Sequence, residues 1–364
     1  MNVSATTAVG TQLAELKGSD SVVNDTFGLS VAISGTTAIV GAPNHANDAG
    51  RAYVFTKSAK GWTQTAELKG SDTAAFDYFG NAVAISGTAV VVVAEGPGRA
   101  YVFTKTARGW RQTAELTGSD TIAGDGFGTS VAISGTTVVV GAYGHARAGR
   151  AYVFTKTARG WGQTAQLKGS DTVLGDRFGS SVAISGTIAV IGAPDHAKNA
   201  GRAYVFTKTA RGWGQTAQLK GSDTVAGDFF GNSVAVSGTA VVVGAEGHAT
   251  YAGRAYVFTK SAEGWTQTAE LKDSETVAYD GFGWSVVISG RTVVVGALGH
   301  AKGAGRAHVF TKTAKEWTQA AELKGSDTVA GDHFGHSVAI SGTTVLVGAS
   351  GHAKSAGRAY VFEA

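Results

Sequence analysis

The chain has 364 residues and no cysteine, and its 31 basic and 27 acidic side chains give a formal net charge of +4. The lack of cysteine excludes disulfide and thiolate sites, and so small a charge gives no argument for a nucleic-acid partner. No apolar run is long enough to span a membrane. The first ten residues have neither the basic start nor the apolar stretch of a signal peptide, so we expect none there.

A Phe-Gly pair recurs seven times, each time followed by the same order of apolar and glycine-rich segments. The pairs begin at Phe27, Phe79, Phe127, Phe178, Phe230, Phe282 and Phe334, at spacings of 48 to 52 residues. A repeat of this length indicates one supersecondary unit that stacks on its neighbours. The repeats leave no linker between them, so we expect an N-terminal tail over 1–10 and one repeat domain over 11–364.

Each repeat predicts four short strands and shows no helical period. In the fourth repeat these are 178–184, 187–193, 202–207 and 213–220. The second is continuously apolar, which is typical of a strand buried on both faces. The third alternates around Tyr204 and Phe206, and the fourth is the most polar and suits an outer edge. Gly-Thr, Ala-Gly and Arg-Gly pairs mark the turns between them.

A four-stranded unit that is apolar on both faces must stack on others, and seven such units can close radially into a β-propeller. The chain starts with a fourth-strand sequence, 11–16, and its last strand, 358–362, is a third strand. We therefore expect the N-terminal strand to complete the last blade in a 3+1 closure, which hides an exposed sheet edge. The predicted fold is all-β, a seven-bladed propeller with four antiparallel strands per blade.

The Phe-Gly pairs followed by Gly-Ala-Pro resemble the FG-GAP repeat. The segments that carry the resemblance are Phe27-Gly28 with Gly41-Ala42-Pro43, and Phe178-Gly179 with Gly192-Ala193-Pro194. The resemblance implies a fold like the seven-bladed head of integrin α chains and of similar bacterial and fungal propellers, including some lectins. It also implies an extracellular, adhesive or ligand-binding role. Calcium is not carried over, because the turn at 34–36 is too short to supply six to eight oxygens. We expect no metal and no cofactor.

Several residues occupy the same place in the repeats, which favours structural roles. We expect Asp25 and the earlier Asp20 to accept backbone N–H groups in the turn before the first strand, the alternative being a ring of metal-binding or acid–base carboxylates. His45, absent from the second repeat, is expected to order its own loop against an aspartate, the alternative being a metal site. The repeated Asp and Arg51 suggest ion pairs between blades, and Trp62 is expected to pack between outer strands.

Function is expected where the copies disagree, immediately before and after each Phe-Gly and on one face, which we call the top face. The candidate ligand-binding residues there are Phe76, Tyr78, Asn81, Glu95, Arg177, Phe229, Tyr279, Trp284, His333 and His336. The second repeat has a shorter loop, so its four candidates are expected to surround a dip in the rim. The second neighbourhood is formed by the candidates of repeats 6 and 7. Aromatic rings beside amide or imidazole groups suit a sugar; the alternative is harmless loop drift.

No nucleophile elbow, zinc-protease motif or phosphate-binding glycine motif is present, so no catalytic residue is assigned. The first hypothesis is a non-enzymatic binding propeller, lectin-like or adhesive, that binds carbohydrate or a protein partner on its top face as a monomer. Two alternatives stay open. One is a structural scaffold of amplified or engineered repeats, and the other is an enzyme with a site at the channel mouth.

Overall fold

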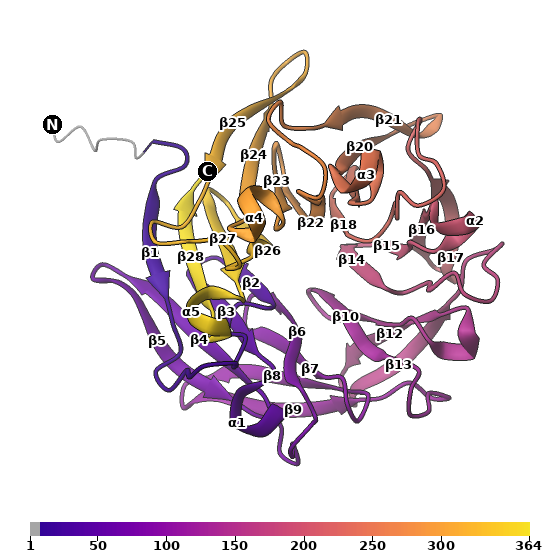
Figure 1. Ribbon diagram of the computed structural model, residues 1–364. Coiled ribbons are helices and arrows are strands. Elements are labelled where there is room, and N and C mark those ends of the chain that lie inside the picture. Colours follow the sequence, from indigo (N-terminus) through magenta and orange to yellow (C-terminus); the bar gives the residue numbers. More distant parts are fainter. Residues whose placement is uncertain (1–7) are drawn as a thin grey trace, which may run out of the picture.

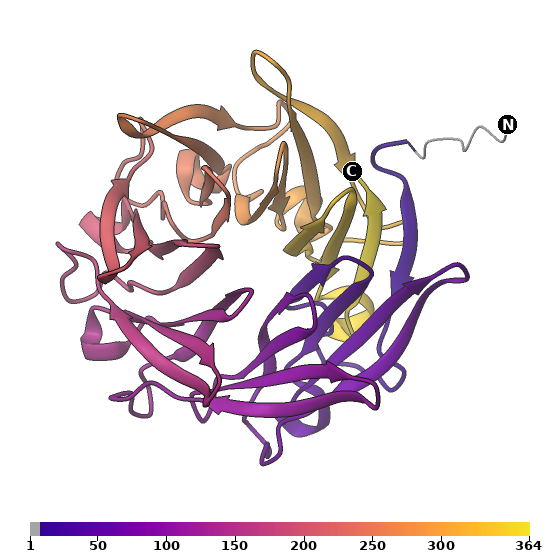
Figure 2. The same cartoon turned by 180° about the vertical axis from the view of Figure 1, so that it is seen from behind.

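A computed structural model describes residues 8–364, which form seven four-stranded antiparallel sheets arranged as the blades of a propeller (Figure 1). The first strands of all blades line a central channel, and the fourth strands form the periphery. Figure 2 shows the same ring from behind. No helix in the described part of the chain is long and apolar enough to cross a membrane.

The strands follow one another in the same order in blades 1 to 6. Blade 1 consists of β2 (Val31–Ser34), β3 (Thr37–Ala42), β4 (Arg51–Ser58) and β5 (Gly61–Leu68), blade 2 of β6 (Phe79–Ser86), β7 (Ala89–Ala94), β8 (Arg99–Thr106) and β9 (Gly109–Leu116), and blade 3 of β10 (Phe127–Ser134), β11 (Thr137–Ala142), β12 (Arg150–Thr157) and β13 (Gly160–Leu167). Blade 4 consists of β14 (Ser181–Ser185), β15 (Ile188–Ala193), β16 (Arg202–Thr209) and β17 (Gly212–Leu219), blade 5 of β18 (Val234–Ser237), β19 (Ala240–Ala245), β20 (Arg254–Ser261) and β21 (Gly264–Leu271), and blade 6 of β22 (Phe282–Ser289), β23 (Thr292–Ala297), β24 (Arg306–Lys312) and β25 (Trp317–Leu323).

Blade 7 is assembled from both ends of the chain. It contains β26 (Phe334–Ser341), β27 (Thr344–Ala349), β28 (Arg358–Glu363) and, as its fourth strand, β1 (Gln12–Leu16). β1 pairs antiparallel with β28, and Arg358 Nε lies 2.6 Å from Glu15 Oε1. The expected tail over 1–10 falls mostly outside the described residues, since 1–7 are not described, and the N–H of Gly10 donates to the carbonyl of Glu363.

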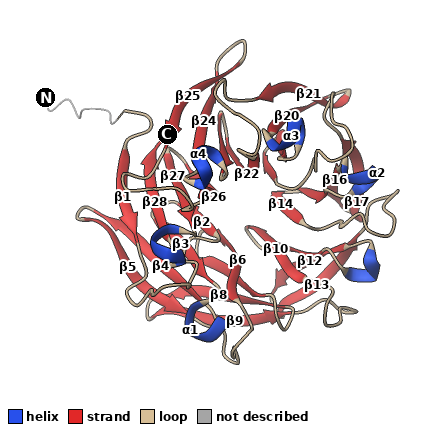
Figure 3. Cartoon of the chain, in the orientation of Figure 1, coloured by secondary structure: helices blue, strands red, loops and turns tan. Residues whose placement is uncertain are grey.

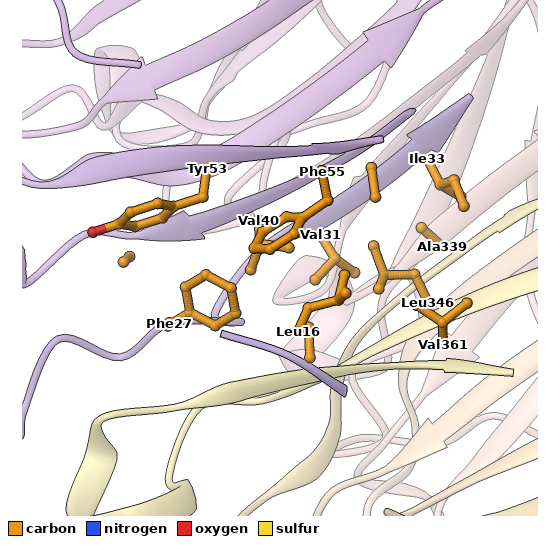
Figure 4. Close-up of a cluster of buried hydrophobic side chains, with 13 residues drawn as sticks. Leu16, Phe27, Val31, Ile33, Val40, Tyr53, Phe55, Ala339, Leu346 and Val361 are labelled. Carbon is orange, nitrogen blue, oxygen red and sulfur yellow. The ribbon is translucent and has the colours of Figure 1, made fainter. Parts of the chain in front are cut away.

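The hydrophobic core lies between neighbouring blades, because the second strand of each blade is apolar on both of its faces. All six residues of β3 are buried. One cluster joins Phe27 and Phe55 of blade 1 to Leu346 and Val361 of blade 7 and to Leu16 of β1 (Figure 4). Burial of such side chains stabilises the fold by about 1.5–3 kcal/mol each, so the blades depend on one another for their stability.

In the described chain the Phe-Gly pair joins six of the seven blades to the one before, the exception being blade 3. Phe178, for example, forms a parallel bridge with Gly149 of blade 3. The strand β14 begins at Ser181 and not at 178 as the sequence predicted. In six blades the next-to-last residue of the second strand is a glycine required by close approach, whereas blade 2 has Val93 in this place. A Cβ on Gly41 would collide with the carbonyl oxygen of Gly80 in the next blade.

One-turn helical segments lie between the second and third strands of six blades in the described chain, and the sequence did not predict them (Figure 3). They are α1 (His45–Asp48), η1 (His145–Arg147), α2 (His196–Asn199), α3 (His248–Tyr251), α4 (His300–Gly303) and α5 (His352–Ser355). Their inner residues have positive φ angles, for example 51° at Ala249 and 60° at Thr250. We call each of these six loops, which begin with a histidine and join a second to a third strand, a His loop. Blade 2 has only the short loop 95–98 in this place.

Candidate functional site

Among the described residues, five of the six histidines of these loops lie between two aspartates of their own blade, and His300 contacts Asp280 alone. In blade 1, His45 Nδ1 lies 2.8 Å from Asp25 Oδ2, which also accepts the backbone N–H of Val22. His45 Nε2 lies 3.5 Å from Asp20 Oδ2, and the Tyr53 hydroxyl donates to Asp20 Oδ1. The turn role of Asp25 and the loop-ordering role of the histidine are confirmed. Asp20 differs from the prediction, because it accepts a tyrosine hydroxyl of the third strand.

Within 8–364, five of the seven repeated arginines form ion pairs, all within a blade, so the predicted ion pairs between blades are wrong. Arg51 Nε lies 2.6 Å from Glu67 Oε1, because strand pairing places Tyr53 opposite Glu67 and Arg51 just beyond it. Blades 5 and 6 repeat this geometry. The predicted Trp62 packs, half-buried, against the cluster of Leu16 and Phe55. These groups therefore stabilise the blades.

The residues after each Phe-Gly do form a ring at the top of the channel. They border a cavity of about 290 Å³ together with the neighbouring serines and valines. Three sequence candidates, Asn81, Trp284 and His336, meet there. Below them the channel is lined by valine, alanine and isoleucine, so the polar groups gather at its mouth.

A smaller hollow opens between blades 5 and 6, and we call it the aromatic pocket. It has a volume of about 190 Å³ and is lined by Glu246, Tyr251, Tyr279, Gly281, Trp284, Leu298 and Gly299. Tyr251 of α3 stacks on Tyr279 of the next blade, with ring centroids 6.2 Å apart and planes 12° apart. The Phe229 ring is tilted by 34° against that of Tyr251, with ring centroids 6.2 Å apart. Tyr279 is 70% exposed and Tyr251 43%, so both rings are available to a ligand.

Glu246 lies in the aromatic pocket and is the most chemically distinctive group there. It accepts a hydrogen bond from Asn232 Nδ2 at 3.0 Å, and burial raises its pKa to about 7. At neutral pH its carboxyl group is therefore partly protonated and can donate as well as accept. Sequence reasoning missed Glu246. A signal was available, because Asn81 and Glu95 occupy the same two repeat positions, and they form the same hydrogen bond at 2.7 Å.

The residue just before each Phe-Gly has a left-handed backbone, which favours glycine. Glycine occupies this position at Gly126 and Gly281, but Tyr78, Arg177 and Phe229 adopt φ of 55° there. A left-handed conformation costs a non-glycine residue about 1–2 kcal/mol. Strain of this kind often accompanies functional positions, which favours a use for these side chains.

Other sequence candidates are engaged within the protein. Arg177 Nε lies 3.1 Å from Asp195 Oδ2, and its guanidinium lies over the Tyr143 ring at 5.8 Å. His336 Nδ1 lies 2.7 Å from Ser350 Oγ, and burial lowers its pKa to about 4. His333 is exposed and lies against the Gly303 loop. Only His336 approaches Trp284, edge-to-face at 5.8 Å.

The dip expected at blade 2 exists, but its walls are not the four predicted residues. A cavity of about 310 Å³ is bordered by 96–99 of the short loop and by 117–118, 121–123 and Phe127 of blade 3. Asn81 instead faces the channel, and Phe76 is 64% exposed. The missing loop segment leaves its space on the side of the next blade, because a His loop leans towards the following blade.

The top face also exposes one aliphatic side chain in almost every blade. The exposed residues at this repeat position are Val22, Ile122, Val173, Val225, Val277 and Val329, each 60–75% exposed. Blade 2 has Ala74 in this place. Exposed apolar groups that gather on one face are typical of interaction surfaces. Among residues 8–364, no cluster of three or more His, Cys, Asp or Glu side chains is arranged to hold a metal ion.

Comparison with known proteins identifies the repeat. The FG-GAP repeat family profile matches the chain seven times, at 11–55, 62–103, 110–154, 161–206, 213–258, 265–310 and 317–362. No curated protein sequence matches significantly.

Solved structures share the fold at low sequence identity. Saccharomyces cerevisiae Sqt1 is 10% identical with a TM-score of 0.55, covering 98% of this chain and 100% of that one. A chain of the Mitotic Checkpoint Complex is 13% identical with a TM-score of 0.61, covering 100% and 98%. Selenomethionine-substituted virginiamycin B lyase from Staphylococcus aureus is 11% identical with a TM-score of 0.62, covering 96% and 99%. At these identities the likeness concerns the fold alone.

Proposed function

The chain belongs to the FG-GAP repeat family, and from this premise we propose that it is a non-enzymatic binding propeller whose top face binds a carbohydrate at the aromatic pocket. The observation that carries the proposal is the stack of Tyr251 and Tyr279 beside the buried carboxyl group of Glu246. A sugar ring needs a flat apolar surface for its C–H face and directional partners for its hydroxyl groups. The pocket offers both within one hollow.

The size of the aromatic pocket limits the ligand. Its volume of about 190 Å³ is below the ~300–1,000 Å³ of sites for drug-sized molecules. We therefore expect one terminal sugar unit to enter, with further units lying over the exposed ring of Tyr279. For one such contact we expect a Kd of about 1 mM, which corresponds to a binding free energy of about −4 kcal/mol.

A protein partner on the same face is the second candidate. The ring of exposed aliphatic residues favours it, because these side chains lie outside the pocket and extend around the face. Such a partner would bury several of them at once, with Tyr279 as a central aromatic anchor. An extracellular location and a monomeric state belong to the proposal through the family resemblance.

A glycan array followed by titration of the bound sugar tests the carbohydrate proposal. Tyr279→Ala should weaken binding at least tenfold, because one stacking surface is lost. Phe76→Ala is the matched control, since Phe76 occupies the same repeat position in blade 2 and is similarly exposed. Absence of any glycan binding, or equal binding by wild type and Tyr279→Ala, would exclude a sugar site at this pocket.

A further inference from the structure

Six of the seven blade junctions are closed by a His loop that supplies backbone acceptors to the following blade. At the junction of blades 1 and 2, the N–H groups of Tyr78 and Phe79 donate to the carbonyls of Asp48 and Ala49. The bridges that mark this closure are Phe27 with Gly357, Gly50 with Phe79, Gly149 with Phe178, Gly201 with Phe230, Gly253 with Phe282, and Gly305 with Phe334. This contact is a property of the repeat.

The junction of blades 2 and 3 is the exception. Within 79–157, all of which is described, the N–H groups of Gly126 and Phe127 have no such bond to blade 2, and no bridge joins the two blades there. A second polar contact is missing as well. Ser30 donates to the carbonyl of Gly80, but blade 2 has Ala82 in the serine position.

An open space marks this junction, and we call it the junction slot. It is the cavity of about 310 Å³ bordered by 96–99, 117–118, 121–123 and Phe127. The histidine that would hold Asp77 is also missing. Asp77 is only half-buried, whereas its equivalents in the other blades are buried. Without that histidine, the carboxylate of Asp77 accepts the backbone N–H of Ala74.

We propose that the junction slot binds a short peptide of small residues in the turn conformation of a His loop, which supplies the carbonyl groups that a His loop supplies at the other junctions. The six closed junctions show the chemistry of the occupant. Two successive carbonyls accept from Gly126 and Phe127, and small side chains fit between the blades. A histidine at the N-terminal side of the peptide reaches Asp77. Recognition through backbone groups resembles strand addition at a sheet edge.

The chain itself provides a suitable peptide. The loop 300–305, His-Ala-Lys-Gly-Ala-Gly, closes the junction of blades 6 and 7 through the carbonyls of Gly303 and Ala304. Gly303 has φ of 79°, so this loop contains glycine at a left-handed position that costs other residues strain. The site lies three junctions from the aromatic pocket, and the proposal does not rest on sugar binding.

Isothermal titration of the full chain with the capped peptide His-Ala-Lys-Gly-Ala-Gly tests the proposal, with a scrambled peptide as reference. We expect saturable binding with a Kd of about 1 mM or lower. Ala123→Trp places a large ring at the wall of the slot and should weaken binding at least tenfold. Ala226→Trp is the matched control, since Ala226 has the same repeat position and exposure in blade 5, where the junction is closed.

A loop graft provides an independent second variant. Replacing 95–98 by the sequence of 246–253 restores the missing four residues and should abolish peptide binding, because the slot is filled from within. Unchanged binding in both Ala123→Trp and the graft, or no saturable binding up to about 10 mM, would overturn the proposal. Sugar binding should be unaffected by Ala123→Trp, which separates this test from that of the aromatic pocket.

Discussion

Blades 2 and 5 carry the same Asn–Glu pair beside the channel, but they end in different top faces. In blade 5, Glu246 of the pair Asn232–Glu246 lines the aromatic pocket together with Tyr251 of α3. In blade 2 the pair Asn81–Glu95 is followed by a short loop and an open slot. The difference teaches that the His loop, and not the polar pair, makes the pocket.

The largest expected effect tests whether the two blades are alike below their loops. Phe79→Ala and Phe230→Ala each remove a fully buried ring, and each should lower the free energy of unfolding by about 3–5 kcal/mol. Urea denaturation of both variants measures this. If the two losses of unfolding free energy differ by more than about 1.5 kcal/mol, the two blades differ in their cores as well as in their loops.

The next prediction concerns the pH dependence of Glu246. Its folded-state pKa of about 7 lies above the ordinary 4.5, so the folded chain binds this proton more tightly than the unfolded chain does. The stabilising contribution is present below pH ~4.5 and is lost as the pH rises towards 7. Glu246→Gln should remove this loss, which amounts to up to about 3 kcal/mol.

Glu95→Gln is the matched variant in blade 2. Burial raises the pKa of Glu95 as well, but blade 2 has no His loop beside it, so we expect a smaller change over the same pH range. Denaturation at pH 4, 5.5 and 7 distinguishes the two. Equal changes in both variants would mean that α3 does not control the environment of the carboxyl group.

Removing the histidine of α3 should make blade 5 resemble blade 2. His248 Nδ1 lies 3.0 Å from the buried Asp228, and His248→Ala should cost about 1–3 kcal/mol. The loop 248–253 should then exchange its amide hydrogens faster, and sugar binding should weaken as Tyr251 loses its support. Hydrogen exchange by mass spectrometry gives the readout. Unaltered protection of this loop would count against its dependence on the histidine.

The smallest effect is expected at the surface arginines. Arg99 pairs with both Asp72 and Glu115, whereas Arg254 pairs with Glu270 alone. Arg99→Met should therefore cost more than Arg254→Met, although both remain within about 0.2–1 kcal/mol. The difference should shrink in 1 M salt, where surface charges are screened. A difference that salt leaves unchanged would point to lost packing and not to charge.

Much of this architecture follows from the spacing of the Phe-Gly pairs, because seven apolar units of equal length can bury their faces only against one another. The pairing of the N-terminal strand with β28 could also be anticipated from the fourth-strand sequence at 11–16. The partner of Arg51 could not be anticipated. The sequence indicates that the repeated Asp and Arg lie near the same end of a sheet, but it does not show which acidic side chain the strand register brings within reach of the arginine. Glu67 is that side chain.

The aromatic pocket was only partly visible in the sequence. Tyr279 and Trp284 were candidates because they differ from their counterparts in other repeats. Glu246 was overlooked. The stacking of Tyr251 on Tyr279 was not predicted either, because the position of the Tyr251 ring depends on left-handed residues of α3. A local backbone conformation of this kind leaves no periodic signal.

The pairing of β1 with β28 has a consequence for synthesis and folding. Residues 12–16 emerge from the ribosome first, and their partners at 358–363 emerge only after six blades have been made. This gives the contact an extreme sequence separation, and folding rates fall as such separations grow. Until the ring closes, the nascent chain exposes the edge of β1, a template for unwanted strand pairing. We therefore expect aggregation during synthesis to be governed by the time between these two events.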